Sequence, residues 1–358
     1  MSVKILSTLG PSSLNKSTVQ ALEKAGVNLF RINLSHTQLE DVEKIISNIQ
    51  AWTEVPICLD SEGAQVRNGL MVAGQALFNT GDLVRIHSCG VIGDSENISF
   101  TPASVCSQLR IGDVIQVDFN SASFSVVDCH SDYLTVKVIH GGYVGSNKGA
   151  VVSRSLKLAA ITQKDEAAFD VGLNMGIKNF ALSFTHCAED VAQARNIIGE
   201  MNLISKIESK NGVNNLESIL QVSDAILIDR GDLSREVPLE NIPFLQKMII
   251  NKAKDFNKNV YVATNLLESM MTNSKPTRAE VNDVMNTLLD GATGLVLAAE
   301  TAIGEQPVAA VDILRTLILR YEASHSGYQM SDLLEHQNLL LPEMHGIESR
   351  IYLGTGND

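Results

Sequence analysis

The regular alternation of short apolar strands with amphipathic helices is the feature that most constrains the fold. Residues 3–10, 27–34 and 56–60 read as strands, and helical patterns cover residues 12–26 and 39–52 between them. This spacing predicts parallel strands joined by right-handed crossovers. The alternation returns after an interruption, with five further strands expected at residues 179–184, 203–208, 225–230, 259–264 and 294–299.

Three strands before the interruption and five after it make eight. The two α/β portions together hold about 240 residues, which is typical of a (β/α)8 barrel. A doubly wound open sheet is the alternative, but it gives no reason for eight units. We therefore expect an α/β protein whose TIM barrel is formed by residues 1–69 and 155–321.

The interruption, residues 70–154, has a different pattern. It contains no convincing helix, and its short alternating runs are separated by Gly, Asn, Asp and Ser. The pattern predicts an inserted antiparallel β domain, with strands at residues 83–88, 113–119, 123–128 and 134–140. Residues 322–358 are less regular, and we expect a C-terminal tail that is helical.

Composition excludes several classes of protein. The 358 residues are 44% hydrophobic, which is enough for a sizeable core and excludes wholesale disorder. A net charge of −13 argues against a protein whose main function is to bind nucleic acid or an anionic membrane. The five cysteines show no C-x-x-C spacing, and neither a signal peptide nor an apolar run of about 18 residues is present. These features favour a cytoplasmic protein.

Polar residues stand where the predicted barrel strands end. In such a barrel the functional groups gather at the C-terminal ends of the strands. Charged groups are rare in a core unless they are paired, so their convergence favours a functional site over a set of solvated loops. The residues at these ends are Arg31, Asn33, Ser35, His36, Asp60, Ser61, Arg67, Ser183, Phe184, Lys206, Glu208, Arg230, Gly231, Asp232, Thr264 and Glu300.

The acidic residues at these ends predict a divalent metal site. Lys206 and Glu208 are two apart, so they face the same side of a strand, and Asp232 offers a second carboxylate. Carboxylates with open water positions suit Mg²⁺ or Mn²⁺. A lysine beside that metal would stabilise a transferring phosphoryl group or a developing enolate. The oxygens of Asn33, Ser35 and Asp60 would suit a monovalent cation.

Seven sequence blocks resemble, in order and spacing, the signature blocks of pyruvate kinase, over about residues 1–320. They are KILSTLGPSS, VNLFRINLSH, ICLDSEGAQVR, ISKIESKNGV, DRGDL, VATNLLESMMTNSKPTRAEVNDVMN and LDGATGLVLAAETAIGEQP. The resemblance implies that the inserted domain is a small antiparallel β-barrel that serves as a lid. It also implies a phosphotransferase that moves the phosphoryl group of phosphoenolpyruvate to ADP, giving pyruvate and ATP.

The resemblance assigns roles by position. It makes Lys206, Arg31 and Thr264 the catalytic residues, with Glu208 and Asp232 holding Mg²⁺ or Mn²⁺. The phosphoenolpyruvate-binding residues would be Arg31, Ser183, Lys206, Gly231, Asp232 and Thr264. The potassium site would be Asn33, Ser35, Asp60 and Ser61, and the nucleotide side would be Pro11, Asn33, His36, Arg67 and Lys148.

Several positions depart from the family pattern, mostly on the nucleotide side. Glu62 stands in place of a lysine, and Gln65 replaces a glutamate that accompanies potassium dependence, which leaves that dependence open. Phe119 and Asn120 alter the lid's usual Asp-Asp-Gly. After DRGDL, the chain has Ser followed by Arg235, which adds bulk and positive charge.

Two readings of the function therefore stay open. In the first, ADP accepts the phosphoryl group; in the second, a specialised acceptor or water does. A non-catalytic binding protein is less favoured. Only about 35 residues follow the predicted barrel, so we expect the family's C-terminal domain to be absent, leaving a homodimer through the barrels as the expected assembly.

Overall fold

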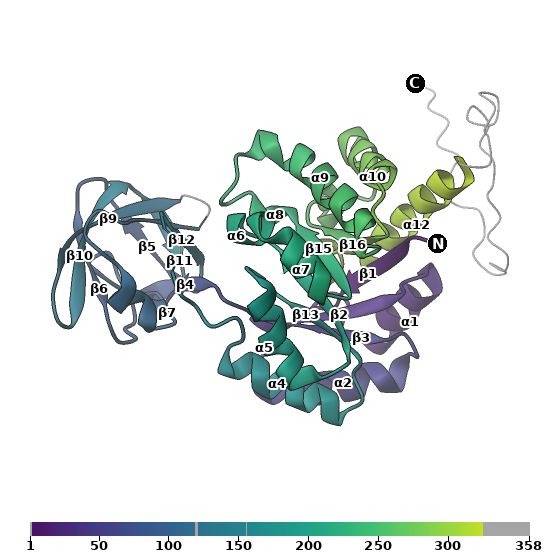
Figure 1. Ribbon diagram of the computed structural model, residues 1–358, viewed down its shortest axis with the longest axis horizontal. Coiled ribbons are helices and arrows are strands. Elements are labelled where there is room, and N and C mark those ends of the chain that lie inside the picture. Colours follow the sequence, from purple (N-terminus) through teal and green to yellow (C-terminus); the bar gives the residue numbers. More distant parts are fainter. Residues whose placement is uncertain (1, 119–120, 155, 325–358) are drawn as a thin grey trace, which may run out of the picture.

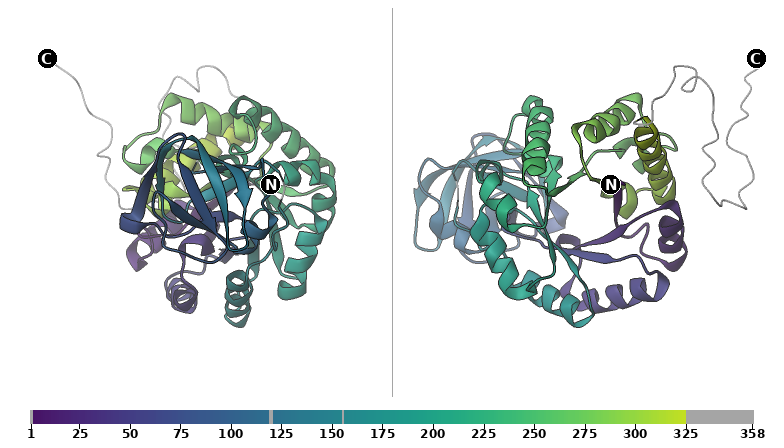
Figure 2. Two further views of the ribbon diagram at one scale, coloured as in Figure 1. Left: turned by 90° about the vertical axis from the view of Figure 1, so that its left-hand side faces the viewer. Right: turned by 45° about the vertical axis from the view of Figure 1, so that its right-hand side comes forward.

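The chain forms two closed β-barrels of different size. The computed structural model describes residues 2–118, 121–154 and 156–324 (Figure 1). A large barrel surrounded by helices carries a small barrel at one end, and Figure 2 shows both from two further sides. The small barrel joins the large one where β3 (Ile57–Asp60) ends, since the chain passes from there into β4 (Val66–Asn68).

The large barrel confirms the predicted (β/α)8 architecture. Its eight strands are all parallel and close in the order β1-β17-β16-β15-β14-β13-β3-β2. Each coincides with a run that the sequence predicts as a strand, and only β14 begins outside its run, one residue earlier than predicted. They are β1 (Lys4–Thr8), β2 (Leu29–Asn33), β3, β13 (Asn179–Leu182), β14 (Asn202–Ile207), β15 (Ala225–Asp229), β16 (Asn259–Ala263) and β17 (Gly294–Leu297).

Helices cover the outside of the large barrel (Figure 2, right). The main ones are α1 (Lys16–Ala25), α2 (Leu39–Trp52), α4 (Gln163–Asn174), α5 (Ala188–Ile198), α7 (Leu216–Val222), α9 (Ile242–Asp255), α10 (Arg278–Asp290) and α12 (Pro307–Ser324). Shorter turns follow several strands: η1 (Leu34–His36), α6 (Lys210–Asn214), α8 (Arg230–Leu233), η4 (Glu268–Met271) and α11 (Ala299–Ala302). Another short turn, η3 (Leu239–Asn241), directly precedes α9.

Local sequence signals set the helix ends. Asn15 caps α1 by accepting a hydrogen bond from the Thr18 N–H, and Gly26 ends it with a left-handed φ of 103°. Thr277 and Glu280 form a capping box at the start of α10. Behind these helices, fully buried side chains such as Phe30 and Phe180 fill the space against the strands. Each large apolar side chain buried there contributes about 2 kcal/mol.

The small barrel has seven strands. They are β4, β6 (Leu83–His87), β7 (Asn97–Thr101), β8 (Val114–Val117), β9 (Ala122–Cys129), β10 (Tyr133–His140) and β12 (Gly149–Val152). A separate two-stranded sheet pairs β5 (Gln75–Phe78) with β11 (Gly142–Gly145), and η2 (Val72–Gly74) precedes it. The inserted β domain is thus confirmed as a closed barrel.

Two details of the small barrel differ from the sequence prediction. The pair β6–β7 is parallel, and the nine residues between the two strands return the chain to the end at which β6 began. A short helix, α3 (Ser104–Gln108), occurs where no helix was expected. Its buried Val105 and Cys106 belong to the core of the small barrel, so tertiary packing explains this helix better than the local pattern does.

The predicted helical tail at residues 322–358 falls outside the described residues beyond Ser324, as do Phe119 and Asn120. Within the described part of the chain, no helix combines the length and the apolar character needed to cross a membrane.

Candidate active site

A cavity of about 500 Å³ opens between the strand ends of the large barrel and the small barrel. We call it the central cavity. The large barrel contributes Arg31, Asn33, Ser35, His36, Ser183, Lys206, Glu208, Asp229, Asp232 and Thr264, and the small barrel contributes Arg67, Asp118 and Lys148. Most of the residues predicted at strand ends therefore meet in one space, because parallel strands bring their C-terminal ends to the same end of the barrel.

A buried ionic cluster forms the floor of this region. The Arg31 Nε donates to Asp60 Oδ2 at 2.6 Å, Arg31 Nη2 also contacts this oxygen, and Lys206 Nζ lies 3.3 Å from it. Burial alone would raise the pKa of Asp60, but Arg31 and Lys206 outweigh burial and lower it. Asp60 therefore stays ionised and holds two cations at the cavity.

Lys206 is fixed from three sides. Its Nζ donates to Ser183 Oγ at 2.9 Å and lies 2.9 Å from Glu208 Oε1, besides its contact with Asp60. Burial would lower the pKa of Lys206, but Asp60 and Glu208 outweigh burial and raise it. The side chain is only 5% exposed, so this ammonium group is a preorganised positive charge with little water around it.

Three carboxylates gather beside Lys206. Single carboxylate oxygens of Glu208, Asp229 and Asp232 all lie within 4.8 Å of one another. Burial raises the pKa of Glu208 to about 8; Asp232 and Asp229 add to the shift, while Lys206 opposes it. Glu208 Oε1 has no partner in hydrogen-bond geometry among the described residues. A hard divalent cation would relieve this repulsion, so the three residues fit Mg²⁺ or Mn²⁺.

Asp229 was not recognised from the sequence as a carboxylate of this group. It ends β15 and accepts a hydrogen bond from the Gly231 N–H at 3.2 Å, so locally it resembles a helix cap. The available signal was its position three residues before Asp232, which makes Asp229 the N-cap of the short helix α8 that contains Asp232.

Thr264 and Gly231 are joined directly. The Gly231 N–H donates to Thr264 Oγ1 at 2.8 Å, and the Thr264 carbonyl accepts from Arg230 Nη2 at 2.6 Å. Arg230 in turn bonds Asp283 at 2.7 Å. Thr264 has a φ of 72°, a conformation that costs a non-glycine residue free energy and recurs at functional sites. Its hydroxyl is thereby held at the end of β16, facing α8.

The loop after β3 packs closely on Ser183. Gly63 has a φ of 74°, and a Cβ on it would lie 2.6 Å from the Ser183 carbonyl oxygen, so only glycine fits. The fully buried Asp165 holds this loop by accepting from the N–H groups of Glu62 at 2.6 Å and Gly63 at 3.1 Å. The same carboxylate completes the capping box of α4 with Thr162.

The residues assigned to the monovalent cation divide into two layers. Asn33 and Ser35 line the central cavity, and the Asn33 Oδ1 accepts from the Ser35 N–H at 3.0 Å. Asp60 and Ser61 are fully buried, and Asn33 pairs with Asp60 across β2 and β3. Amide, hydroxyl and carboxylate oxygens are thus on adjacent strands, although the Asp60 carboxylate is already bonded to Arg31 and Lys206.

A second cavity, of about 550 Å³, adjoins the central one. We call it the apolar cavity. Pro11, Arg31, Asn33 and His36 line it together with aliphatic residues that include Leu9, Ile45, Ala302 and Ile303. Burial lowers the pKa of His36, with Arg67 and Arg31 adding to the shift, so the imidazole is neutral at pH 7. A largely apolar cavity with Arg31 in its lining suits a flat heterocycle linked to phosphate.

The small barrel supplies two of the predicted cations, Arg67 and Lys148. Arg67 Nη1 donates to the Asn147 carbonyl at 2.9 Å, and Lys148 Nζ lies 3.7 Å from Asp118.

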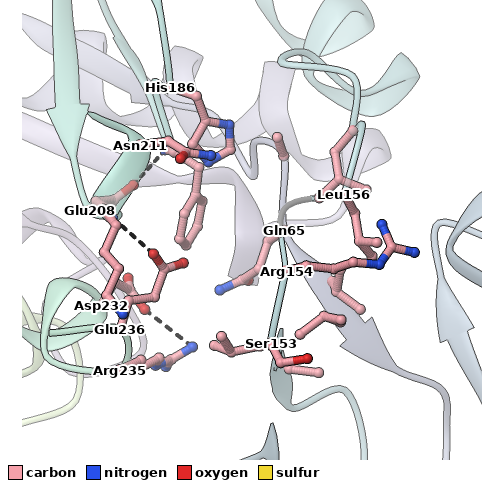
Figure 3. Close-up of a pocket in the computed structure, with 18 of the residues that line it drawn as sticks. Gln65, Ser153, Arg154, Leu156, His186, Glu208, Asn211, Asp232, Arg235 and Glu236 are labelled. Atoms are coloured by element: carbon pink, nitrogen blue, oxygen red, sulfur yellow. Dashed lines mark hydrogen bonds and ion pairs between the residues drawn. The ribbon is translucent and has the colours of Figure 1, made fainter. Parts of the chain in front are cut away.

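A third cavity, of about 500 Å³, lies between β12 and the large barrel, and shares Glu208, Asp232 and Arg235 with the central cavity (Figure 3). We call it the side cavity.

Glu300 does not join the site. It is buried, and its carboxylate accepts from the N–H groups of Leu267 at 3.2 Å and Ala298 at 2.9 Å. These bonds tie the loop after β16 to the loop after β17, so its role is structural.

Comparison with known proteins shows which family this chain resembles. Residues 1–311 match the family model described as "Pyruvate kinase, barrel domain". The chain is 34% identical over 350 residues to the pyruvate kinase of Geobacillus stearothermophilus, which covers 94% of this chain and 58% of that protein. It is 32% identical to the pyruvate kinase of Thermotoga maritima (96% of this chain, 80% of that protein). For the pyruvate kinase of Mycobacterium tuberculosis the identity is 33% (90% and 71%).

The chain spans less than two thirds of the length of the Geobacillus protein. The match nevertheless covers both barrels and every residue of the central cavity. Fold, strand-end chemistry and sequence similarity agree, and the chain belongs to the pyruvate kinase family.

Proposed function

We propose that the protein transfers the phosphoryl group of phosphoenolpyruvate to ADP, giving pyruvate and ATP. The observation that carries this proposal is the pairing of two fixed cations, Arg31 and Lys206, with the carboxylates of Glu208, Asp229 and Asp232 in one cavity. The cations suit a phosphoryl group, and the carboxylates suit the divalent metal that phosphoryl transfer uses. The adjoining apolar cavity supports a nucleoside diphosphate as the acceptor.

Different residues of the chain would carry out different parts of the reaction. Arg31 and Lys206 stabilise the negative charge of the phosphoryl group as its bond to the enol oxygen breaks and its bond to an ADP oxygen forms. The Gly231 N–H and Thr264 hydroxyl orient the donor, and Ser183 holds Lys206 in place. The enolate left behind takes up a proton from the solvent at its methylene carbon, through water near Thr264, and becomes pyruvate.

The metal requirement follows from the carboxylate cluster. Glu208 and Asp232, with Asp229, would hold Mg²⁺ or Mn²⁺, which neutralises charge on the phosphates when it is bound. Asn33, Ser35, Asp60 and Ser61 would hold K⁺. On the nucleotide side, Pro11 and His36 would contact the base, and Arg67 and Lys148 the phosphates.

The domain roles are part of the proposal. Residues 1–69 and 155–321 would form the catalytic domain, and residues 70–154 would close over it as a lid. The exposed Leu239, Phe244 and Met248 on and just before α9 support a homodimer through the large barrels. We place the enzyme in the cytoplasm, because its five cysteines are all free thiols, which suits a reducing compartment.

A specialised acceptor is the second candidate. It is favoured by Glu62 and Arg235, which change the charges lining the central cavity relative to the family pattern. Water as the acceptor would release inorganic phosphate from phosphoenolpyruvate.

One experiment separates these candidates. The protein is incubated with phosphoenolpyruvate, Mg²⁺ and K⁺, with and without ADP, while ³¹P NMR follows phosphate and an independent assay follows pyruvate. ATP appearing together with pyruvate only when ADP is present supports the first candidate. Inorganic phosphate without ADP supports hydrolysis, and a total lack of turnover in both samples contradicts the ADP reaction.

A further inference from the structure

We propose that Arg235 is a positioning residue that connects the small barrel to the carboxylate cluster and competes with a divalent cation for Asp232. The inference rests on the proposed function only through the metal. Its mechanical part, the connection between the two barrels, stands on the geometry alone.

Arg235 lies at the carboxylate cluster. It follows α8, three residues after Asp232, and its Nη1 is 3.2 Å from Asp232 Oδ1 (Figure 3). It lines both the central cavity and the side cavity, so it stands where these two spaces meet. The pair is only partly shielded, with side-chain exposures of 21% and 23%. The guanidinium therefore occupies one face of a carboxylate that a metal would need.

The same guanidinium fills a space beside the small barrel. A Cβ built on Gly149 of β12 would lie 2.3 Å from Arg235 Nη1 and 3.4 Å from Gln65 Nε2. The absence of a side chain at Gly149 is what allows Arg235 to approach the backbone of β12. Since Arg235 belongs to the large barrel and Gly149 to the small one, this contact spans the two barrels.

The positive charge of Arg235 affects both Asp232 and any cation that binds beside it. Arg235 partly neutralises Asp232 and opposes any second cation beside it. It also faces Arg67, whose pKa is lowered by burial and further by Arg235. A divalent ion entering among Glu208, Asp229 and Asp232 must share Asp232 with the guanidinium or displace it. Displacement would move Arg235 away from Gly149 and remove this contact between the two barrels. Metal binding should therefore loosen the packing of the small barrel against the large one.

The first test removes the charge. Arg235→Leu is compared with wild type and with Lys247→Gln, which removes an equal charge at an exposed lysine that pairs with Asp290. Mn²⁺ binding is measured by EPR without phosphoenolpyruvate or nucleotide. We expect Arg235→Leu to bind Mn²⁺ about threefold to tenfold more tightly, and Lys247→Gln to match wild type.

The second test reads the contact between the barrels. Amide hydrogen exchange is followed in the metal-free proteins over residues 147–152 and over β4. Arg235→Leu should raise exchange there about tenfold, because β12 loses its support from the large barrel. Gly149→Ala displaces the flexible end of Arg235 and keeps its charge, so it should raise exchange at the same residues with a smaller change in Mn²⁺ affinity.

The outcomes separate the inference from the proposed function. If neither wild type nor Arg235→Leu binds Mn²⁺, the metal part of the proposed function fails, and so does the competition; the exchange measurement then still decides the connection. Unchanged or weaker Mn²⁺ binding by Arg235→Leu overturns the competition. Exchange equal to wild type in both Arg235→Leu and Gly149→Ala overturns the connection between the barrels.

Discussion

Lys206 and Glu208 lie side by side where β14 ends, with Lys206 Nζ 2.9 Å from Glu208 Oε1 and both side chains almost wholly buried. Their spacing of two residues turns them to the same side of the chain. Lys206 reaches towards Asp60 and Ser183, and Glu208 towards Asp229 and Asp232. One short segment therefore supplies a cation for the phosphoryl group and a ligand for the metal.

Replacing the lysine should separate these two roles. We expect Lys206→Met to lower kcat for pyruvate formation by about 10³-fold, because it removes a preorganised charge from a water-poor site. Mn²⁺ binding should persist, since all three carboxylates remain. Steady-state kinetics and EPR measure the two effects, with the exposed Lys247→Met as the matched control. Turnover within tenfold of wild type would exclude the proposed role of Lys206.

The raised pKa of Glu208 predicts how stability depends on pH in the metal-free protein. The pKa is about 8 in the folded chain against 4.5 ordinarily, because of burial first and neighbouring carboxylates second. Between these values the folded state binds more protons than the unfolded state, so the stability contributed by this group falls as pH rises. Relative to Glu208→Gln, wild type should lose up to about 3 kcal/mol of unfolding free energy from pH 5 to pH 8.

Urea denaturation of both proteins at each pH, in the presence of a chelator, measures this difference. Adding Mn²⁺ should abolish the trend, because a bound cation favours the ionised carboxylate. Stability curves that stay parallel for wild type and Glu208→Gln across this pH range would contradict a raised pKa.

The large barrel could be predicted from the sequence because its strands are continuous apolar runs and its helices carry clear signals at their ends. Thr277, Glu280 and Gly291 mark both ends of α10 in the sequence itself. In the small barrel, β4 has three residues and β12 has four, which is too short for a periodic pattern. Their pairing is set by tertiary contacts.

The candidate site was predictable in part for the same reason. Strand ends are fixed by the fold, so Arg31, Lys206 and Glu208 follow from it. Asp229 was missed because its carboxylate also caps α8, and Asp165 because the loop that it holds lies about a hundred residues away in the sequence. The contact of Arg235 with Gly149 depends on how the two barrels pack, which the local sequence does not encode.

The fit of Gly63 against Ser183 gives a second mutational prediction. Gly63→Ala should lower stability by about 3 kcal/mol, from an unfavourable φ and a Cβ 2.6 Å from the Ser183 carbonyl oxygen. Gly74 is the matched control, because it also has a positive φ, 84°, but nothing lies within 4 Å of its Cβ position. Gly74→Ala should cost only about 1 kcal/mol.

Gly63→Ala should also reduce activity more than Gly74→Ala does. Displacing Ser183 disturbs its bonds to Lys206 and Asp60, so Gly63→Ala should also lower kcat, whereas Gly74→Ala should not. Chemical denaturation and kinetics on both variants provide the comparison. Equal losses of stability in the two variants would mean that the φ value, and not the contact with Ser183, accounts for the cost.

Replacing Gly231 should weaken substrate binding and leave the stability of the protein almost unchanged. A Cβ on Gly231 would lie 3.4 Å from Asp229 Oδ1 and 3.5 Å from Thr264 Cγ2, which is ordinary van der Waals contact. Gly231→Ala should therefore change the unfolding free energy by less than about 1 kcal/mol. The added methyl group would stand beside the N–H that we propose binds the donor, so KM for phosphoenolpyruvate should rise at least about tenfold. Thermal unfolding and steady-state kinetics test this, and an unchanged KM would remove Gly231 from the donor site.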